Sequence, residues 1–189
     1  TYNLTVTNTT NGCTATASVT VDQDNTPPDA DIAPPLQIDC NNSTVQIDAG
    51  GSTFIPPSTF AWSPTNGIVS GGNTLNPVVN GPGTYTLTIT QSNGCTDVAS
   101  VTISQNTTPP TAVAVAPNPI SCTNPTITIN GNGSSTGPNF TYQWTANPGN
   151  IVSGDQTLNP TVDIAGTYTV LVTNTATGCT KTATVTVGG

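Results

Sequence analysis

The chain has 189 residues, a net charge of −8 and one basic side chain, Lys181. It contains no His and no Glu, so Asp is the one carboxylate left to act as a general base near neutral pH, which argues against an enzyme. A single cation cannot neutralise phosphates, and no apolar run approaches the roughly 18 residues of a membrane span, so neither nucleic acid binding nor direct membrane insertion is expected.

An internal repeat with a period of about 82 residues determines the predicted organisation. The matching segments are Pro27-Pro28 with Pro109-Pro110, Cys40 with Cys122, Trp62 with Trp144, Ile68–Gly71 with Ile151–Gly154, Thr74–Pro77 with Thr157–Pro160, and Gly83–Thr86 with Gly166–Thr169. Residues 1–26 match only the end of a repeat. We therefore predict a C-terminal hairpin of a truncated repeat plus linker at 1–26, and complete domains at 27–108 and 109–189.

The first expected element is a hairpin around Asn11-Gly12, a dipeptide that tolerates the positive φ of a tight turn. A two-stranded hairpin is at best marginal alone in water, because its apolar face has nothing to cover it. We expect it to complete a sandwich whose first strands lie in an earlier part of a longer tandem array. The linkers at 22–28 and 104–110 each end in a paired Pro and are expected to be semi-rigid.

Each complete repeat shows the apolar pattern of half-buried strands, with alternation at Tyr85, Leu87 and Ile89. Turn-forming Gly, Pro and Asn recur about every 8 to 12 residues, as in all-β sandwiches. The predicted fold class is all-β, with tandem immunoglobulin-like β-sandwiches of about seven strands each in an extended row. The predicted core residues are Trp62, Trp144, Tyr85 and Tyr168, the two tyrosines at the position of a tyrosine corner.

Several motifs follow one another in the same order in both repeats. They are an aromatic-x-Trp segment (Phe60-Ala61-Trp62 and Tyr142-Gln143-Trp144), an Asn-Pro pair, Gly83–Thr90 and Asn93–Thr96. This order resembles the PKD-like and immunoglobulin-like tandem repeats of giant cell-surface adhesins of Bacteroidota. The resemblance implies filaments or adhesins, including those of gliding motility. The chain departs from the PKD pattern directly after each Trp, where that family has a Trp-x-Phe-Gly-Asp-Gly segment.

Cysteines recur at two positions of the repeat: before the second strand (Cys40, Cys122) and after the final hairpin turn (Cys13, Cys95, Cys179). Equal recurrence, and the lack of His to complete a zinc site, favour structural disulfides over nucleophiles or metal ligands. No catalytic residue, cofactor or metal site is therefore expected.

Two disulfide connectivities are open. The first pairs cysteines within repeats, Cys40–Cys95 and Cys122–Cys179, and leaves Cys13 to a partner outside this sequence. The second joins neighbouring sandwiches through Cys40–Cys179 and leaves the other three cysteines to further repeats. The first requires Cα atoms within roughly 7 Å, whereas opposite poles of a sandwich lie about 20 to 25 Å apart.

Calcium is a further candidate at the first linker, where Asp22, Asp24, Asp29 and Asp31 supply oxygen ligands. A calcium site that rigidified every linker would recur, yet the second linker has no matching carboxylates. The difference favours a solvated acidic linker.

The leading functional hypothesis is a non-catalytic structural spacer repeat of an extracellular, cell-surface adhesin or filament. Five cysteines, no methionine and many Asn-x-Thr triplets are typical of a secreted protein. The expected partners are neighbouring repeats of the same long chain, and other copies in a filament are a further candidate. The alternative is a glycan-binding or other adhesive β-sandwich module. That alternative needs exposed loop aromatics, whereas the aromatics here fall mostly in predicted strands.

Overall fold

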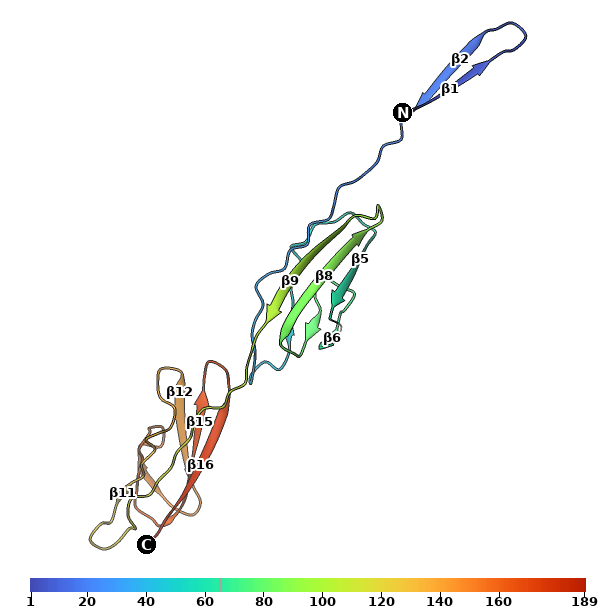
Figure 1. The fold of residues 1–189 in the computed structure, drawn as a ribbon. Helices are drawn as coiled ribbons and strands as arrows, with labels where there is room; N and C mark the ends of the chain where they lie inside the picture. The colour runs from blue at the N-terminus through green and yellow to red at the C-terminus, as the bar shows by residue number, and fades with distance from the viewer. Residues whose placement is uncertain (65) are drawn as a thin grey trace.

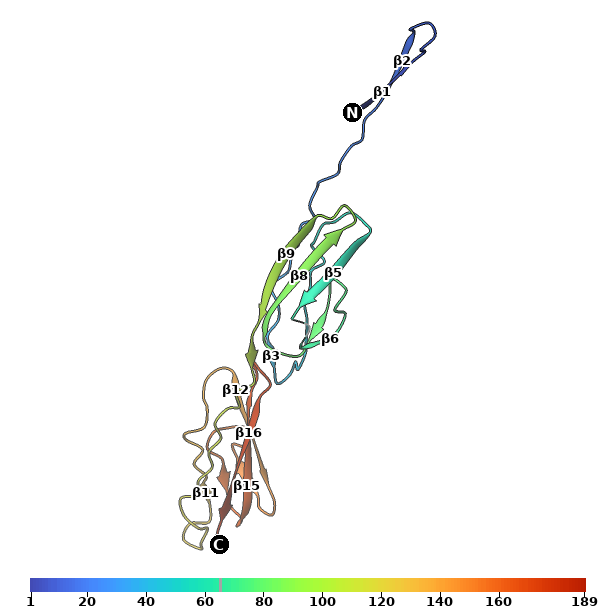
Figure 2. The ribbon, with the colours of Figure 1, turned by 45° about the vertical axis from the view of Figure 1, so that its right-hand side comes forward.

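A computed structural model describes residues 1–64 and 66–189. All its regular secondary structure is β-strand, and no helix among these residues could span a membrane. Figure 1 shows three bodies in an extended row: a hairpin at the N-terminal end, a first sandwich, and a second sandwich that ends at the C-terminus. The view turned by 45° shows the same row (Figure 2). The all-β tandem β-sandwich fold is confirmed.

The first sandwich consists of two three-stranded antiparallel sheets. One sheet has the order β5-β8-β9, and the other has the order β4-β7-β6. The bounds are β4 Val45–Gln46, β5 Ser58–Ser63, β6 Ile68–Ser70, β7 Val78–Val79, β8 Gly83–Gln91 and β9 Thr96–Ile103. A further strand, β3 (Ile38–Asp39), pairs in parallel with β10 (Gln105–Asn106) of the linker.

The second sandwich repeats this arrangement with sheets β12-β15-β16 and β11-β14-β13. Its strands are β11 Ile127–Thr128, β12 Phe140–Ala146, β13 Ile151–Ser153, β14 Thr161–Val162, β15 Gly166–Asn174 and β16 Thr180–Val187. The residue that matches Ile38 is Ile120, which donates its N–H to Gly188 O at 2.9 Å without forming a named strand. The second sandwich therefore has six named strands rather than the predicted seven. In the first sandwich the seventh strand is β3, which forms by pairing with β10 of the linker.

Each sandwich has its own hydrophobic core. The first core draws its residues from Ala30 to Ile103, and the second draws its residues from Ala112 to Val187. Along β8, the side chains of Tyr85, Leu87 and Ile89 are buried in alternation with partly exposed threonines, as the period-two pattern predicts. The predicted domain boundaries lie between these cores and remain predictions.

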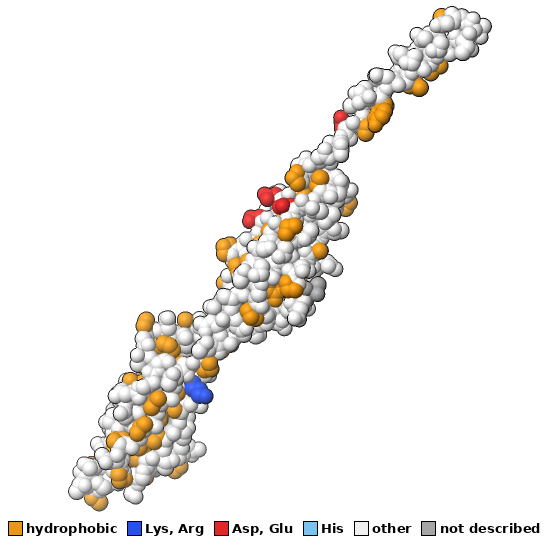
Figure 3. Space-filling view, viewed as in Figure 1, with side chains coloured by type: hydrophobic (Ala, Val, Ile, Leu, Met, Phe, Trp, Pro, Cys, Tyr) orange, Lys and Arg blue, Asp and Glu red, His pale blue; other side chains and the backbone are white. Residues whose placement is uncertain are grey.

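The N-terminal hairpin consists of β1 (Tyr2–Thr7) and β2 (Thr14–Val19), which pair antiparallel. Every residue of both strands is exposed. Tyr2, Leu4 and Val19 are 60 to 70% exposed, although the matching strands β8 and β9 bury theirs against the opposite sheet. Figure 3 shows the apolar side chains of this hairpin lying open to solvent.

We expect the backbone amides of β1 and β2 to exchange with solvent much faster than those of β8 and β9 in the isolated chain. The hairpin has no packed apolar face to oppose its opening, so its local opening free energy lies near zero. Hydrogen exchange followed by mass spectrometry measures this difference directly. Equal protection of the two hairpins in a monomeric sample would contradict the expectation.

Candidate functional site

The four predicted core residues are buried and hydrogen bonded. Trp62 Nε1 donates to Thr74 O at 2.8 Å, and Trp144 Nε1 donates to Thr157 O at 3.0 Å. Both acceptors open the repeated Thr-Leu-Asn-Pro motif, which explains why Trp and motif recur together. Each tyrosine hydroxyl donates to the carbonyl four residues upstream, Tyr85 to Gly81 and Tyr168 to Ile164, as in a tyrosine corner.

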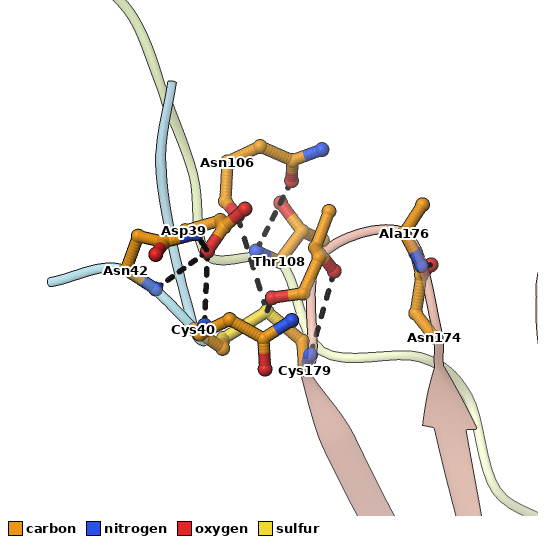
Figure 4. Close-up of a disulfide and its surroundings, with 10 residues drawn as sticks. Asp39, Cys40, Asn42, Asn106, Thr108, Asn174, Ala176 and Cys179 are labelled. Atoms are coloured by element: carbon orange, nitrogen blue, oxygen red, sulfur yellow. Dashed lines mark hydrogen bonds between the residues drawn. A yellow bond between two sulfur atoms is a disulfide. The ribbon is translucent and has the colours of Figure 1, made fainter. Parts of the chain in front are cut away.

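A disulfide bond between Cys40 and Cys179 joins the two sandwiches (Figure 4). Their Cα atoms lie 5.0 Å apart although the residues are 139 positions apart in sequence. Cys40 directly follows β3, at the end of the first sandwich that faces its neighbour, and Cys179 directly precedes β16. Because such bonds persist in oxidising surroundings, the disulfide is typical of an extracellular protein.

Three chain segments meet at this bond, and we call their contact region the junction. The segments are the loop 38–42 of the first sandwich, the linker 104–110, and the turn 174–179 of the second sandwich (Figure 4). The N–H groups of Cys40 and Asn41 both donate to Thr177 O, at 3.0 and 3.2 Å. The carboxylate of Asp39 accepts from the N–H groups of Asn41 and Asn42, which fixes the shape of the loop.

The linker takes part in the same network. Ile38 donates its N–H to Ser104 O at 3.0 Å, and β3 pairs with β10. Thr177 and Cys179 are 6% and 1% exposed, whereas Cys40 and Asn41, on the first sandwich, are exposed. Backbone hydrogen bonds, a short parallel ladder and a covalent bond therefore all act at one contact.

Gly178 lies in the turn at the junction and has φ +70°, a conformation that side chains with a Cβ rarely adopt. A Cβ at this position would overlap the side chain of Asn41 from the first sandwich. Gly94 is the matching glycine of the first sandwich; it has φ +83° and nothing within 4 Å of an added Cβ. The two glycines thus share a backbone requirement, but only Gly178 has the close approach.

Gly178→Ala should destabilise the second sandwich more than Gly94→Ala destabilises the first. Both variants carry the cost of about 1 to 2 kcal/mol for a left-handed Ala. Gly178→Ala must also displace Asn41, which adds about 0.5 to 3 kcal/mol. The excess is measured by chemical denaturation and should disappear in the double variant Gly178→Ala/Asn41→Ala. An excess that persists without the Asn41 side chain would contradict the proposed overlap.

The remaining cysteines are unbonded in this chain: Cys13 and Cys122 are exposed, and Cys95 is half-buried. The within-repeat connectivity, Cys40–Cys95 and Cys122–Cys179, is therefore wrong, because Cys40 and Cys179 bond to each other. The physical reason is that the two cysteine positions of one repeat lie at opposite ends of its sandwich.

The turn that carries Cys95 contacts the first linker. Asn93 Nδ2 donates to the carbonyls of Asp24 and Thr26 in the first linker, at 3.3 Å each. Asp24 and Thr26 match Asn106 and Thr108 of the second linker, which run beside the Cys179 turn in Figure 4. Both sandwiches thus place a cysteine-bearing turn against the preceding linker.

The carboxylates considered for calcium are not gathered into a site. Asp24 Oδ1 accepts from the N–H of Thr26, and that hydrogen bond holds the pKa of Asp24 below its usual value. The backbone of Asp29 pairs with Thr53, and the N–H of Asp31 donates to Ser52. In residues 1–64 and 66–189, no group of three His, Cys, Asp or Glu side chains is placed to hold a metal ion.

Asp97, on β9, attaches the start of the first sandwich to its sheet. Its Oδ2 accepts from Ala30 N–H at 2.8 Å, and this bond, with a second from Val98 N–H, lowers the pKa of the carboxyl. A pKa lowered by folding adds stability above the unfolded value of about 3.9. That stability is lost as the pH falls through the folded pKa.

We therefore expect Asp97→Asn to reduce the loss of stability of the first sandwich between pH 5 and pH 3. The variant keeps an oxygen acceptor near Ala30 but cannot be protonated in this range. Urea denaturation at both pH values checks the expectation. Asp155→Asn, in the second sandwich, serves as a control. If Asp97→Asn lost as much stability between the two pH values as the unmodified chain, the pH dependence would not come from the Asp97 carboxylate.

Sequence reasoning missed the polar part of the junction. The hydrogen bonds of Asn41, of Thr177 and of the β3–β10 ladder are made by backbone groups. Because every residue type has these groups, the sequence does not indicate which of them pair. The one available signal was the recurrence of Cys at two fixed repeat positions, and it left two connectivities open.

The aromatic side chains do not form an exposed platform. Trp62 and Trp144 are buried, and Phe54 packs edge-to-face on Phe60 beside the first core, with ring centroids 5.0 Å apart. Among the described aromatic residues, Tyr2 alone is exposed.

No protein-family model and no curated protein sequence matches the chain. Among solved structures it is similar to murine CEACAM1b, with 14% identity, a TM-score of 0.36, and coverage of 77% of this chain and 92% of that one. It is also similar to extracellular domains 3–5 of Drosophila OTK, with 15% identity, a TM-score of 0.38, and coverage of 94% and 66%.

The immunoglobulin domains 1–5 of Sidekick-1 are a third similar structure, with 17% identity, a TM-score of 0.34, and coverage of 97% of this chain and 45% of that one. All three similarities are weak.

Proposed function

We propose that the chain is a non-catalytic spacer of an extracellular, cell-surface adhesin or filament, in which sandwiches of one repeat type are joined end to end by disulfides. The observation that carries the proposal is the junction, where the Cys40–Cys179 bond and backbone hydrogen bonds lock two successive sandwiches. The two sandwiches contact each other end to end rather than side by side (Figure 1), so each added sandwich would lengthen the row.

The remaining cysteines fit the same scheme. Cys122 matches Cys40, so it would bond to the turn cysteine of a following sandwich, while Cys95 and Cys13 match Cys179 and would bond to preceding ones. Cys13 and Cys122 are exposed and Cys95 is half-buried, and none of the three has a partner within this chain. The resemblance to the adhesin repeats of Bacteroidota supports the finer assignment to a surface filament, of the gliding-motility adhesin type.

The surface agrees with a passive role. The net charge is −8, and Lys181 is the one blue side chain in Figure 3, so no basic patch is available to bind polyanions. The exposed apolar side chains of the two sandwiches form small groups separated by polar surface in this view, which soluble surfaces tolerate.

A chain extended by a further copy of residues 106–189 tests the proposal. Refolding with oxidised and reduced glutathione supplies the oxidant: glutathione disulfide accepts the two electrons, and each cysteine releases one proton. We expect Cys122 to bond to the cysteine of the added turn, as Cys40 bonds to Cys179. We also expect the maximum dimension in small-angle scattering to increase by the length of one sandwich.

The Cys122→Ser version of the extended chain is the matched control and should lack only the new bond. If Cys122 kept a free thiol while Cys40–Cys179 formed, or if the added sandwich folded back without adding length, the spacer proposal would be wrong.

A further inference from the structure

We infer that tension applied between the two ends of the chain passes through the Cys40–Cys179 bond and bypasses the bodies of both sandwiches. The inference rests on the proposed function for the origin of such tension, because a spacer between a surface and an adhesive contact is pulled from both ends. The bypass itself follows from the covalent connectivity and the fold.

The shortest covalent path from one end of the chain to the other omits most of the protein. It runs along residues 1–40, crosses the disulfide, and continues along residues 179–189. Residues 41–178 form a closed loop outside this path and contain β4 to β15. Of the buried hydrophobic residues, all except Ile38, Cys179 and Val187 lie in this loop.

Two segments carry the tension. Residues 27–40 run along the first sandwich, from the end nearest the N-terminal hairpin to the junction (Figure 1). Strand β16 runs along the second sandwich, from the junction toward the C-terminus. Both are already extended, so little length is gained if they detach.

The two segments are attached to their sandwiches at several points. Asp29 and Thr53 exchange backbone hydrogen bonds of 2.9 Å, and Ala33 donates to Asp48 O at 2.8 Å. Strand β16 pairs with β15 over its whole length, from Gly166↔Val187 to Thr173↔Thr180. Because the pull lies along these strands, the hydrogen bonds are sheared together rather than opened one by one.

The disulfide prevents a long segment of the chain from extending. A sequence separation of 139 residues corresponds to roughly 460 to 500 Å of extended chain. The ends of that segment lie only 5.0 Å apart in the fold, so nearly all of this length is withheld while the bond is intact. Under tension, reduction of this one bond should be enough to let the withheld length extend.

Single-molecule force spectroscopy on the full chain, held by tags at its N- and C-termini rather than through thiols, tests the inference. In non-reducing buffer we expect no extension step of the size of a whole sandwich. With dithiothreitol we expect two such steps of roughly 230 to 250 Å each, one per sandwich, because together they release the segment between Cys40 and Cys179. The total gain should approach the withheld length.

Two variants make the test specific. The double variant Cys40→Ser/Cys179→Ser should show both steps without any reductant, whereas Cys122→Ser, which removes an exposed unbonded thiol, should behave like the unmodified chain. Two sandwich-sized steps from the oxidised chain would overturn the inference. That outcome leaves the spacer proposal standing, because the spacer proposal is tested by the bond at Cys122 and the length of the extended chain.

Discussion

Replacing Cys40 and Cys179 by Ser should lower the free energy of unfolding by about 2 to 5 kcal/mol. The bond closes a loop with a sequence separation of 139, and the chain-entropy account assigns the largest stabilisation to long loops. The melting temperature should fall by roughly 4 to 20 °C, given about 2 to 4 °C per kcal/mol for a chain of this size.

The matched control for this prediction is Cys122→Ser. Cys122 occupies the same repeat position as Cys40, but it is exposed and unbonded, so its replacement should change stability by less than about 0.5 kcal/mol. Calorimetry of both variants in non-reducing buffer makes the comparison. Equal melting temperatures for the unmodified chain and the double variant would show that the bond does not stabilise the fold.

Trp144→Ala should destabilise the second sandwich by about 3 to 5 kcal/mol. The side chain is 2% exposed at the centre of the second core, so its removal leaves a large cavity. The carbonyl of Thr157 also loses the donor at 3.0 Å that satisfies it. The first sandwich has a separate core, and its own unfolding transition should stay unchanged in the reduced protein.

Leu171→Ala is the control for this core substitution. Leu171 lies on β15, next to the buried Val170, but it points outward and is 37% exposed. Its truncation should cost less than about 1 kcal/mol, measured by urea denaturation under reducing conditions. Similar losses for Trp144→Ala and Leu171→Ala would contradict the assignment of Trp144 to the core.

The strand pattern and the repeat were readable from the sequence because both rest on local or periodic signals. The alternation at Tyr85, Leu87 and Ile89 places one face of β8 inward, and the same pattern recurs in β15. Glycines at turn positions, such as Gly94 with its positive φ, likewise indicate where the hairpins lie.

The junction could not be predicted to the same extent, because it depends on which ends of two sandwiches meet. Cys40 is as compatible with Cys95 as with Cys179 until the strand directions are known in space. The strand β3 is a similar case, because Ile38 becomes part of a ladder only when Gln105 of the linker lies beside it. Such pairings are non-local and leave no period in the sequence.

Peptide mapping of the non-reduced full chain tests the central claim most directly, since the spacer and the tension path both depend on one disulfide. After digestion with the free thiols blocked, we predict a linked pair of peptides that contain Cys40 and Cys179, with Cys13, Cys95 and Cys122 recovered as blocked thiols. Recovery of Cys40 linked to Cys95, with Cys122 linked to Cys179, would contradict the account.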